Sequence, residues 1–204
     1  RGVLSYSTPV VVPAPEGEEL IVNSSAGIEA FDPATGKALW HFDESNQFPI
    51  PVAMHHEGVI YLSRGYRSGP YMAIRPGGRG DISASHVVWE VPTGAPYISS
   101  LVYHEGILYM ASDVGAVTAI DAATGRRIWQ QRVEGIFSAS PVAADGKVYF
   151  VSETGETIVL AVQSDGAPWE TSCQVLPESC ERYSPKCGAP GMLAPRSTPL
   201  QQTL

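Results

Sequence analysis

The residues of this sequence whose types and spacing could support chemistry are, first, a group of arginines. Four of them fall within sixteen residues, at Arg64, Arg67, Arg75 and Arg79. Guanidinium groups bind carboxylate or sulfate through paired hydrogen bonds. In a chain with a formal net charge of −8 they form a local basic spot, so they are a candidate patch for an anionic ligand. The alternative, which we favour, is a solvated and irregular set of loops.

Histidines are the second candidate, because an imidazole can bind a metal ion. The sequence has five, and His56 and His104 occupy the same place in two repeated segments. We expect them on equivalent turns of successive units, too far apart to share an ion, and His55 alone cannot complete a site beside His56. No Ser-His-Asp order, paired carboxylates or phosphate-binding glycine loop stands out. The sequence therefore predicts no catalytic, metal-binding or cofactor-binding residue. Asn23 starts an Asn-Ser-Ser sequence that fits N-glycosylation in a eukaryotic source.

The composition indicates a globular all-β chain. Its strands and turns must position any residues that bind a ligand. Apolar residues make up 44% and charged residues 17% of the 204, which is unlike a disordered protein. Twenty glycines and seventeen prolines separate short apolar runs, as in chains of strands with frequent turns. The acidic balance argues against a nucleic-acid partner. There is no membrane-spanning run and no signal peptide, and we expect the chain to be an internal piece of a longer protein.

An internal repeat in the sequence indicates where the strands are expected. The segments DPATGKALW (32–40) and DAATGRRIW (121–129) are nearly identical, and Trp89 stands at the equivalent place between them. The spacings from Trp40 to Trp89 to Trp129 are 49 and 40 residues. Each unit holds four short alternating runs separated by turns. Four strands in about 40 residues predict the blade of a β-propeller.

We therefore predict a propeller fragment of about four four-stranded blades. It occupies residues 1–166, with units at about 7–43, 49–92, 97–132 and 138–166. Residues 167–204, which contain all three cysteines, are expected to be an irregular tail. Because the fourth unit lacks a recognisable tryptophan strand, we expect an open arc whose end blades do not meet. Apolar end faces would then require missing blades or self-association.

The recurring tryptophan should have a structural role. It follows a D-x-x-T-G turn, in which Asp and Thr bond the local backbone and Gly takes a left-handed conformation. Its ring can lie between neighbouring blades with its N–H bonded to a carbonyl group. The predicted structural residues of this blade motif are Asp32, Gly36, Trp40, Trp89, Asp121, Gly125 and Trp129.

These residues resemble the pyrroloquinoline-quinone-like (PQQ-like) repeat family of β-propellers, whose blades end in an A-x-D-x-x-T-G-K-x-x-W motif. The first copy matches at Ala30, Asp32, Thr35, Gly36, Lys37 and Trp40. The second matches at Ala119, Asp121, Thr124, Gly125 and Trp129, with Arg126 in place of Lys. Stretches such as AIRPGGRGD and GAPYISS are similar to a bacterial secreted or periplasmic subgroup. The resemblance covers roughly residues 3–165 and implies a periplasmic or secreted protein.

The resemblance implies two functions. The one we favour is a non-catalytic binding or scaffold module whose ligand is a protein or a polymer such as a polysaccharide. It needs no cofactor and, although quinoprotein-like in its repeats, it is not expected to be an enzyme. The alternative is a fragment of a PQQ-dependent quinoprotein dehydrogenase, which would require quinone and calcium. The adjacent cysteine pair of those enzymes is absent from the repeats, and no Glu, Asn and Asp set matches their calcium ligands and base.

Overall fold

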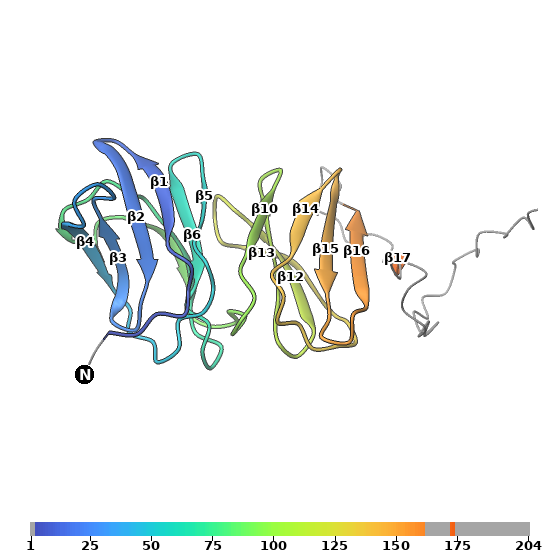
Figure 1. Ribbon diagram of the computed structural model, residues 1–204. Helices are drawn as coiled ribbons and strands as arrows, with labels where there is room; N and C mark the ends of the chain where they lie inside the picture. The colour runs from blue at the N-terminus through green and yellow to red at the C-terminus, as the bar shows by residue number, and fades with distance from the viewer. Residues whose placement is uncertain (1–2, 162–171, 174–204) are drawn as a thin grey trace, which may run out of the picture.

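The computed structural model describes residues 3–161 and 172–173 of the chain (Figure 1). These residues contain no helix, and their strands form four sheets that stand side by side in a row. No helix of the described part is long and apolar enough to cross a membrane. The predicted all-β fold class is confirmed.

Each sheet contains the strands of one sequence repeat, hydrogen-bonded in chain order. The first sheet contains β1 (Val10–Ala14), β2 (Gly17–Asn23), β3 (Gly27–Phe31) and β4 (Ala38–Asp43). The second contains β5 (Met54–His56), β6 (Val59–Ser63), β7 (Tyr71–Ile74) and β9 (Val87–Val91). The third contains β10 (Val102–His104), β11 (Ile107–Ala111), β12 (Ala116–Asp121) and β13 (Arg127–Arg132). The fourth contains β14 (Val142–Ala144), β15 (Lys147–Val151), β16 (Thr157–Ala161) and β17 (Ser172–Cys173).

The sheets pack face to face, and a separate apolar core fills each of the three gaps between them. The core between the first two sheets includes Ile21 and Trp40 from one side and Ile60 and Met72 from the other. The middle sheets are covered on both faces, so β7 and β11 are buried along their whole length. Strand β2 of the first sheet instead alternates between buried and half-buried residues, because only one of its faces meets a neighbouring sheet.

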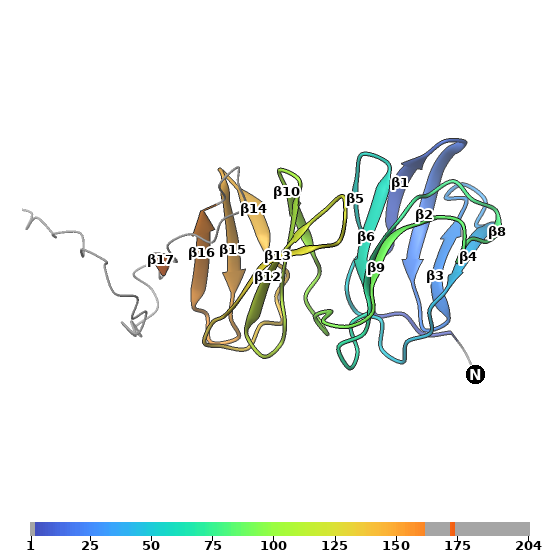
Figure 2. The same cartoon turned by 180° about the vertical axis from the view of Figure 1, so that it is seen from behind.

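The row is open. The first strands β5, β10 and β14 contact one another in succession, which places the inner side of the arc along them. Figures 1 and 2 show the first and fourth sheets at opposite ends of the row in both views. The described part of the chain therefore forms the arc of four blades that the repeat predicts.

The second repeat carries an insertion that joins the first sheet. Strand β8 (Gly80–Asp81) leaves the second unit and pairs in parallel with β4, with Trp40 opposite Gly80 and His41 opposite Asp81. The first sheet therefore has five strands. This insertion accounts for the longer spacing from Trp40 to Trp89. Sequence patterns indicate only irregular loops for these residues, since two paired residues give no alternation to detect.

The fourth sheet extends beyond the boundary predicted at residue 166. Its outer strand β17 pairs with β16 through Ile158 opposite Cys173 and Val159 opposite Ser172. This strand comes from the segment predicted as an irregular tail. The remainder of that predicted tail, residues 174–204, lies outside the described residues.

Candidate functional site

The predicted anion patch does not form around Arg64, because this side chain is fully buried. It follows β6 and extends into the first sheet, where its guanidinium group donates to the carbonyl oxygens of Ser24 (2.8 Å) and Gly27 (3.2 Å). It also donates to the side chain of Asn23 and to the carbonyl of Glu44. Burial lowers the pKa of Arg64 to about 10, so the group stays charged at neutral pH. The prediction of an accessible arginine here is wrong, since protein carbonyls have replaced the solvent.

Asn23 belongs to the same buried connection. Its amide nitrogen donates to the carbonyl oxygens of Pro51 (2.8 Å) and Ser63 (3.4 Å), and only 1% of the residue is exposed. An amide enclosed between two sheets cannot accept a glycan, so the N-glycosylation prediction is wrong for this fold. The Asn23 and Arg64 side chains instead tie the first two blades together.

The other three arginines lie in separate surroundings. Arg67 is exposed and its guanidinium carbon lies 5.2 Å from the centre of the Tyr66 ring. Arg75 is also exposed. Arg79 forms ion pairs with Glu16 and Glu19. The four predicted residues therefore do not share one site: Arg64 is buried, the other three are exposed, and of these Arg79 is ion-paired.

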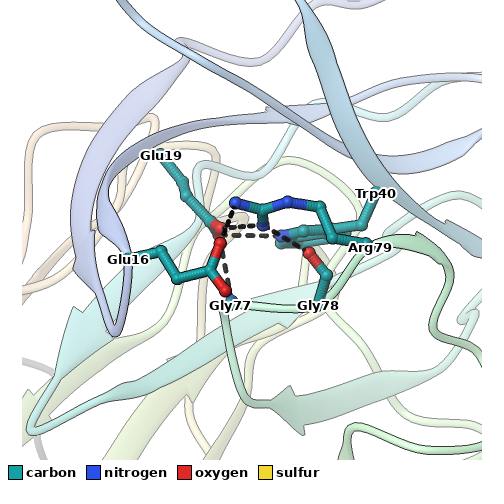
Figure 3. Close-up of polar contacts among 6 residues, drawn as sticks. All are labelled: Glu16, Glu19, Trp40, Gly77, Gly78 and Arg79. Atoms are coloured by element: carbon teal, nitrogen blue, oxygen red, sulfur yellow. Dashed lines mark hydrogen bonds and ion pairs between the residues drawn. The ribbon is translucent and has the colours of Figure 1, made fainter.

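Arg79 belongs to a polar cluster that closes the outer side of the first sheet (Figure 3). The carboxylate of Glu19, on β2, is 2% exposed and accepts from Trp40 Nε1 at 2.7 Å and from the Gly77 N–H at 3.2 Å. Arg79 Nη1 lies 3.5 Å from its second oxygen. Sequence reasoning missed this cluster because Glu19 and Arg79 are 60 residues apart and belong to different repeats.

A close backbone approach at Gly77 brings the insertion of the second repeat against the β1–β2 hairpin. Gly77 has a φ of +99°, and a Cβ there would lie 2.6 Å from the Pro15 ring. Only glycine fits at that approach without strain. The cluster therefore holds the insertion against the β1–β2 hairpin, and its carboxylate is occupied by donors of the protein itself.

The blade-motif tryptophans take equivalent positions in the sheets. Trp40, Trp89 and Trp129 each stand opposite an alanine, and a bulge follows at the same place in all three sheets. Trp40 and Trp89 are buried, whereas Trp129 is half-buried. Trp89 Nε1 donates to the Ala122 carbonyl of the next blade at 2.8 Å, while Trp40 donates to a carboxylate instead of the expected carbonyl.

The turns before these tryptophans are built by local hydrogen bonds. Asp32 accepts from the N–H groups of Ala34 (2.8 Å) and Thr35 (3.0 Å), and Asp121 accepts from Thr124 N–H at 2.9 Å. Gly36 and Gly125 have φ values of +71° and +72°. A Cβ at Gly125 would lie 2.6 Å from the Trp89 ring, so this glycine also permits contact between blades. These residues therefore position the backbone of the turns.

A row of aromatic rings lies at one end of the sheets, and we call Tyr6, Phe48, Tyr66 and Tyr97 the aromatic row. Successive ring centres are 6.2, 4.9 and 5.5 Å apart, with interplanar angles of 46°, 85° and 52°. The rings come from the segments before β1, after β4, within the β6–β7 connection and after β9. These segments all lie at the same end because strands alternate in direction. No pattern in the sequence indicates the row, since its members fall in four separate loops.

The loops beneath the aromatic row are fixed by hydrogen bonds. Tyr6 N–H donates to the Pro49 carbonyl at 3.1 Å, and Tyr97 N–H donates to Asp113 Oδ1 at 2.9 Å. Tyr6 is 58% exposed, and the other three rings are half-buried. The described residues include eight large exposed apolar side chains, and five lie at this same end. They are Val3, Leu4, Tyr6, Val114 and Ile136.

An open hollow of about 440 Å³ continues this end of the molecule at the third sheet. It is lined by Val114, Arg132, Val133, Glu134 and Gly135. Together, the aromatic row and the hollow form a mixed apolar and polar surface across the first three blades. Such a surface can bind a partner.

The structure also gathers three metal-ligating side chains that the sequence analysis did not select. One ligand atom from each of His41, Asp43 and Asp81 lies within 4.8 Å of the others, and all three residues are exposed. They belong to two repeats, so their proximity depends on the pairing of β8 with β4.

Comparison with known proteins identifies the repeats. Residues 24–176 match a family model described as outer membrane protein assembly factor BamB. Tetrathionate hydrolase of Acidithiobacillus ferrooxidans is 30% identical over 131 residues, which are 61% of this chain and 26% of that protein. This chain thus spans about a quarter of the curated relative.

Two solved structures share the fold. BamB from Moraxella catarrhalis superposes with a TM-score of 0.57 at 18% identity, over 82% of this chain and 50% of that one. The computationally designed Ika4 protein superposes with a TM-score of 0.58 at 14% identity, over 77% of this chain and 92% of that one. At such identities the likeness supports the fold alone, and it confirms the predicted propeller fragment.

Proposed function

Because this chain belongs to the PQQ-like repeat family of β-propellers matched by the BamB family model, we propose that it is a non-catalytic binding or scaffold module of an exported bacterial protein. The matched description, an outer membrane protein assembly factor, supports a periplasmic or secreted location and a protein partner. The observation that carries the proposal is the aromatic row, which is the surface we assign to that partner.

The aromatic row has the properties of a protein-binding surface. Aromatic side chains contribute much of the binding energy at protein interfaces, because they bury a large area for little loss of conformational freedom. Contiguous exposed apolar surface is uncommon unless it binds something. The loops that carry these rings are already hydrogen-bonded to one another, so little ordering is required on binding. Arg67, placed beside Tyr66, adds a cation at the edge of the row.

The ring geometry favours a protein over a polysaccharide. Sugar rings stack on flat aromatic faces, whereas neighbouring rings here are tilted by 46° to 85°. Tilted rings leave slots between their edges that accept apolar side chains. A polysaccharide ligand would be expected to need a more coplanar platform.

A site-specific cross-linking experiment tests this assignment. A photo-reactive phenylalanine is placed at Tyr66 or, as a control at the opposite end of the sheets, at Glu57, and the protein is produced in the bacterial envelope. We expect a discrete protein adduct from position 66 and none from position 57. The double variant Tyr6→Ala, Tyr97→Ala should lose that adduct while keeping its circular dichroism spectrum. Equal labelling at both positions would contradict the assignment of this surface.

The outer faces of the two end sheets are a further binding surface under this proposal. Val11 of the first sheet and Val142 of the fourth are exposed. We expect the isolated chain to pair these faces by self-association, and the addition of further blades to prevent it. Light scattering after size-exclusion chromatography measures this directly, and a stable monomer at high concentration would contradict it.

A second candidate function is part of an enzyme, because the curated relative is named a hydrolase. The PQQ-dependent dehydrogenase considered from the sequence belongs to the same class of hypothesis. Two assays separate these candidates from the binding module: loss of tetrathionate in the presence of the chain, and an absorbance titration with PQQ and calcium. Turnover, or one-to-one uptake of the quinone, would favour an enzyme.

A further inference from the structure

The pairing of β8 with β4 places two side chains with metal-ligating atoms on the same face of the first sheet. His41 stands opposite Asp81 in the parallel pair, and Asp43 follows His41 by two residues on β4. Side chains two residues apart on a strand share a face, so all three point to the same side. His41 Nε2 lies 3.8 Å from Asp43 Oδ1. The juxtaposition is therefore set by strand register and is not a chance meeting of loop side chains.

Ser83 holds the two carboxylate residues in relation to each other. Its hydroxyl donates to Asp81 Oδ1 at 2.6 Å, and its N–H donates to the same oxygen at 2.9 Å. The same hydroxyl accepts from the Asp43 N–H at 2.8 Å. Asp81 is thus oriented through Oδ1, while its other carboxylate oxygen accepts neither of these bonds and can face a cation.

The charge around these three residues also favours a cation. Among the described residues, His41 is the basic side chain recorded within ion-pair distance of Asp43, and no lysine or arginine pairs with either carboxylate. Two neighbouring carboxylates repel each other when both are charged. A divalent ion between them would remove the repulsion.

We propose that His41, Asp43 and Asp81 bind one divalent transition-metal ion, with water completing the coordination, and that the ion fastens the insertion of the second repeat to the first sheet. Ligand atoms about 2.1 Å from a metal lie roughly 3–4 Å apart, so atoms within 4.8 Å need only small side-chain rotations. An imidazole with two carboxylates suits zinc or a similar ion better than calcium or magnesium. This site is independent of the aromatic row.

Isothermal titration of the full chain with zinc chloride tests the proposal. The protein is free of any tag, and Cys173, Cys180 and Cys187 are alkylated beforehand, because thiolates would bind zinc themselves. We expect binding of one zinc ion per chain and a rise in melting temperature, with far weaker binding of magnesium. His41→Ala and Asp81→Asn should abolish both effects.

Two variants sharpen the test. Asp145→Asn removes one exposed negative charge far along the sequence, on the β14–β15 turn, and should leave zinc binding unchanged. Ser83→Ala should weaken binding about tenfold, because hydrogen bonds that orient a metal ligand typically contribute factors of about 10–100. Circular dichroism without zinc checks that each variant is folded. The proposal fails if the chain binds no zinc at 1 mM, or if His41→Ala and Asp81→Asn bind it as the unmodified chain does.

Discussion

Two copies of one motif, residues 30–40 and 119–129, have the same local structure in different surroundings. In both, the backbone N–H of the aspartate donates to the residue five positions later, at 2.9 Å, and the glycine N–H returns to the aspartate carbonyl. In both, the tryptophan stands opposite an alanine and a bulge follows. The eleven residues of the motif therefore specify the turn and the strand register by themselves.

The surroundings differ at the outer edge of the sheet. Trp40 is 2% exposed, its N–H bonds to Glu19, and its strand is paired on the far side with β8. Trp129 is half-buried, and within the described residues its strand β13 has no partner beyond it. The motif determines where the tryptophan stands, whereas its burial depends on the neighbouring repeat: the insertion covers Trp40, and the next blade covers Trp89 at Ala122 and Gly125.

The largest expected effect is on stability when each tryptophan is truncated. Trp40→Ala should cost about 3–5 kcal/mol, as other large-to-small changes in packed cores do. Trp129→Ala should cost less, about 1–2 kcal/mol, because less apolar area is removed from the interior. Urea unfolding followed by fluorescence measures both. Equal losses would show that the insertion adds nothing to the burial of Trp40.

Glu19 should account for part of the difference in stability loss between Trp40→Ala and Trp129→Ala. Glu19→Ala leaves the buried Trp40 N–H without an acceptor and releases the insertion, at a cost of about 1–3 kcal/mol. Glu19→Gln keeps one acceptor oxygen and should lose less. Hydrogen exchange of the Gly80 and Asp81 amides should speed up in the alanine variant. Unchanged exchange there would indicate that β8 is held by other contacts.

The sequence predicted the parts of the structure that repeat. Three tryptophans in phase and the D-x-x-T-G turns were enough to predict an all-β propeller arc, because local turn chemistry and strand alternation depend on nearby residues. The position of Arg64 was predicted wrongly, since four carbonyl and amide oxygens of another blade bury it. The aromatic row and the cluster of His41, Asp43 and Asp81 likewise depend on contacts between repeats, which have no period to detect.

Arg79 should have a smaller and salt-dependent effect. Its side chain is 48% exposed, and its partner Glu16 is 67% exposed, so solvent screens the pair. Arg79→Ala should cost about 0.2–1 kcal/mol at low salt, and the difference from the unmodified chain should shrink in 1 M NaCl. Arg67→Ala, which removes an exposed arginine without an ion pair among the described residues, is the matched control. A loss independent of salt would mean that Arg79 acts through packing instead of charge.

The smallest expected effect concerns the Asp32 turn and its dependence on pH. The N–H groups of Thr35 and Ala34 donate to this carboxylate and lower the pKa of Asp32 below its ordinary value of 3.8. Because the folded pKa is below the unfolded one, the turn stabilises the fold fully above about pH 4, and this contribution is lost as the pH falls through the folded value. Asn at position 32 can still accept one hydrogen bond but carries no charge to protonate. Asp32→Asn should therefore be slightly less stable than the unmodified chain at pH 6, and the two should converge near pH 3. Urea midpoints measured at both pH values decide the matter, and a gap that does not narrow in acid would show that the charge of Asp32 is irrelevant to the turn.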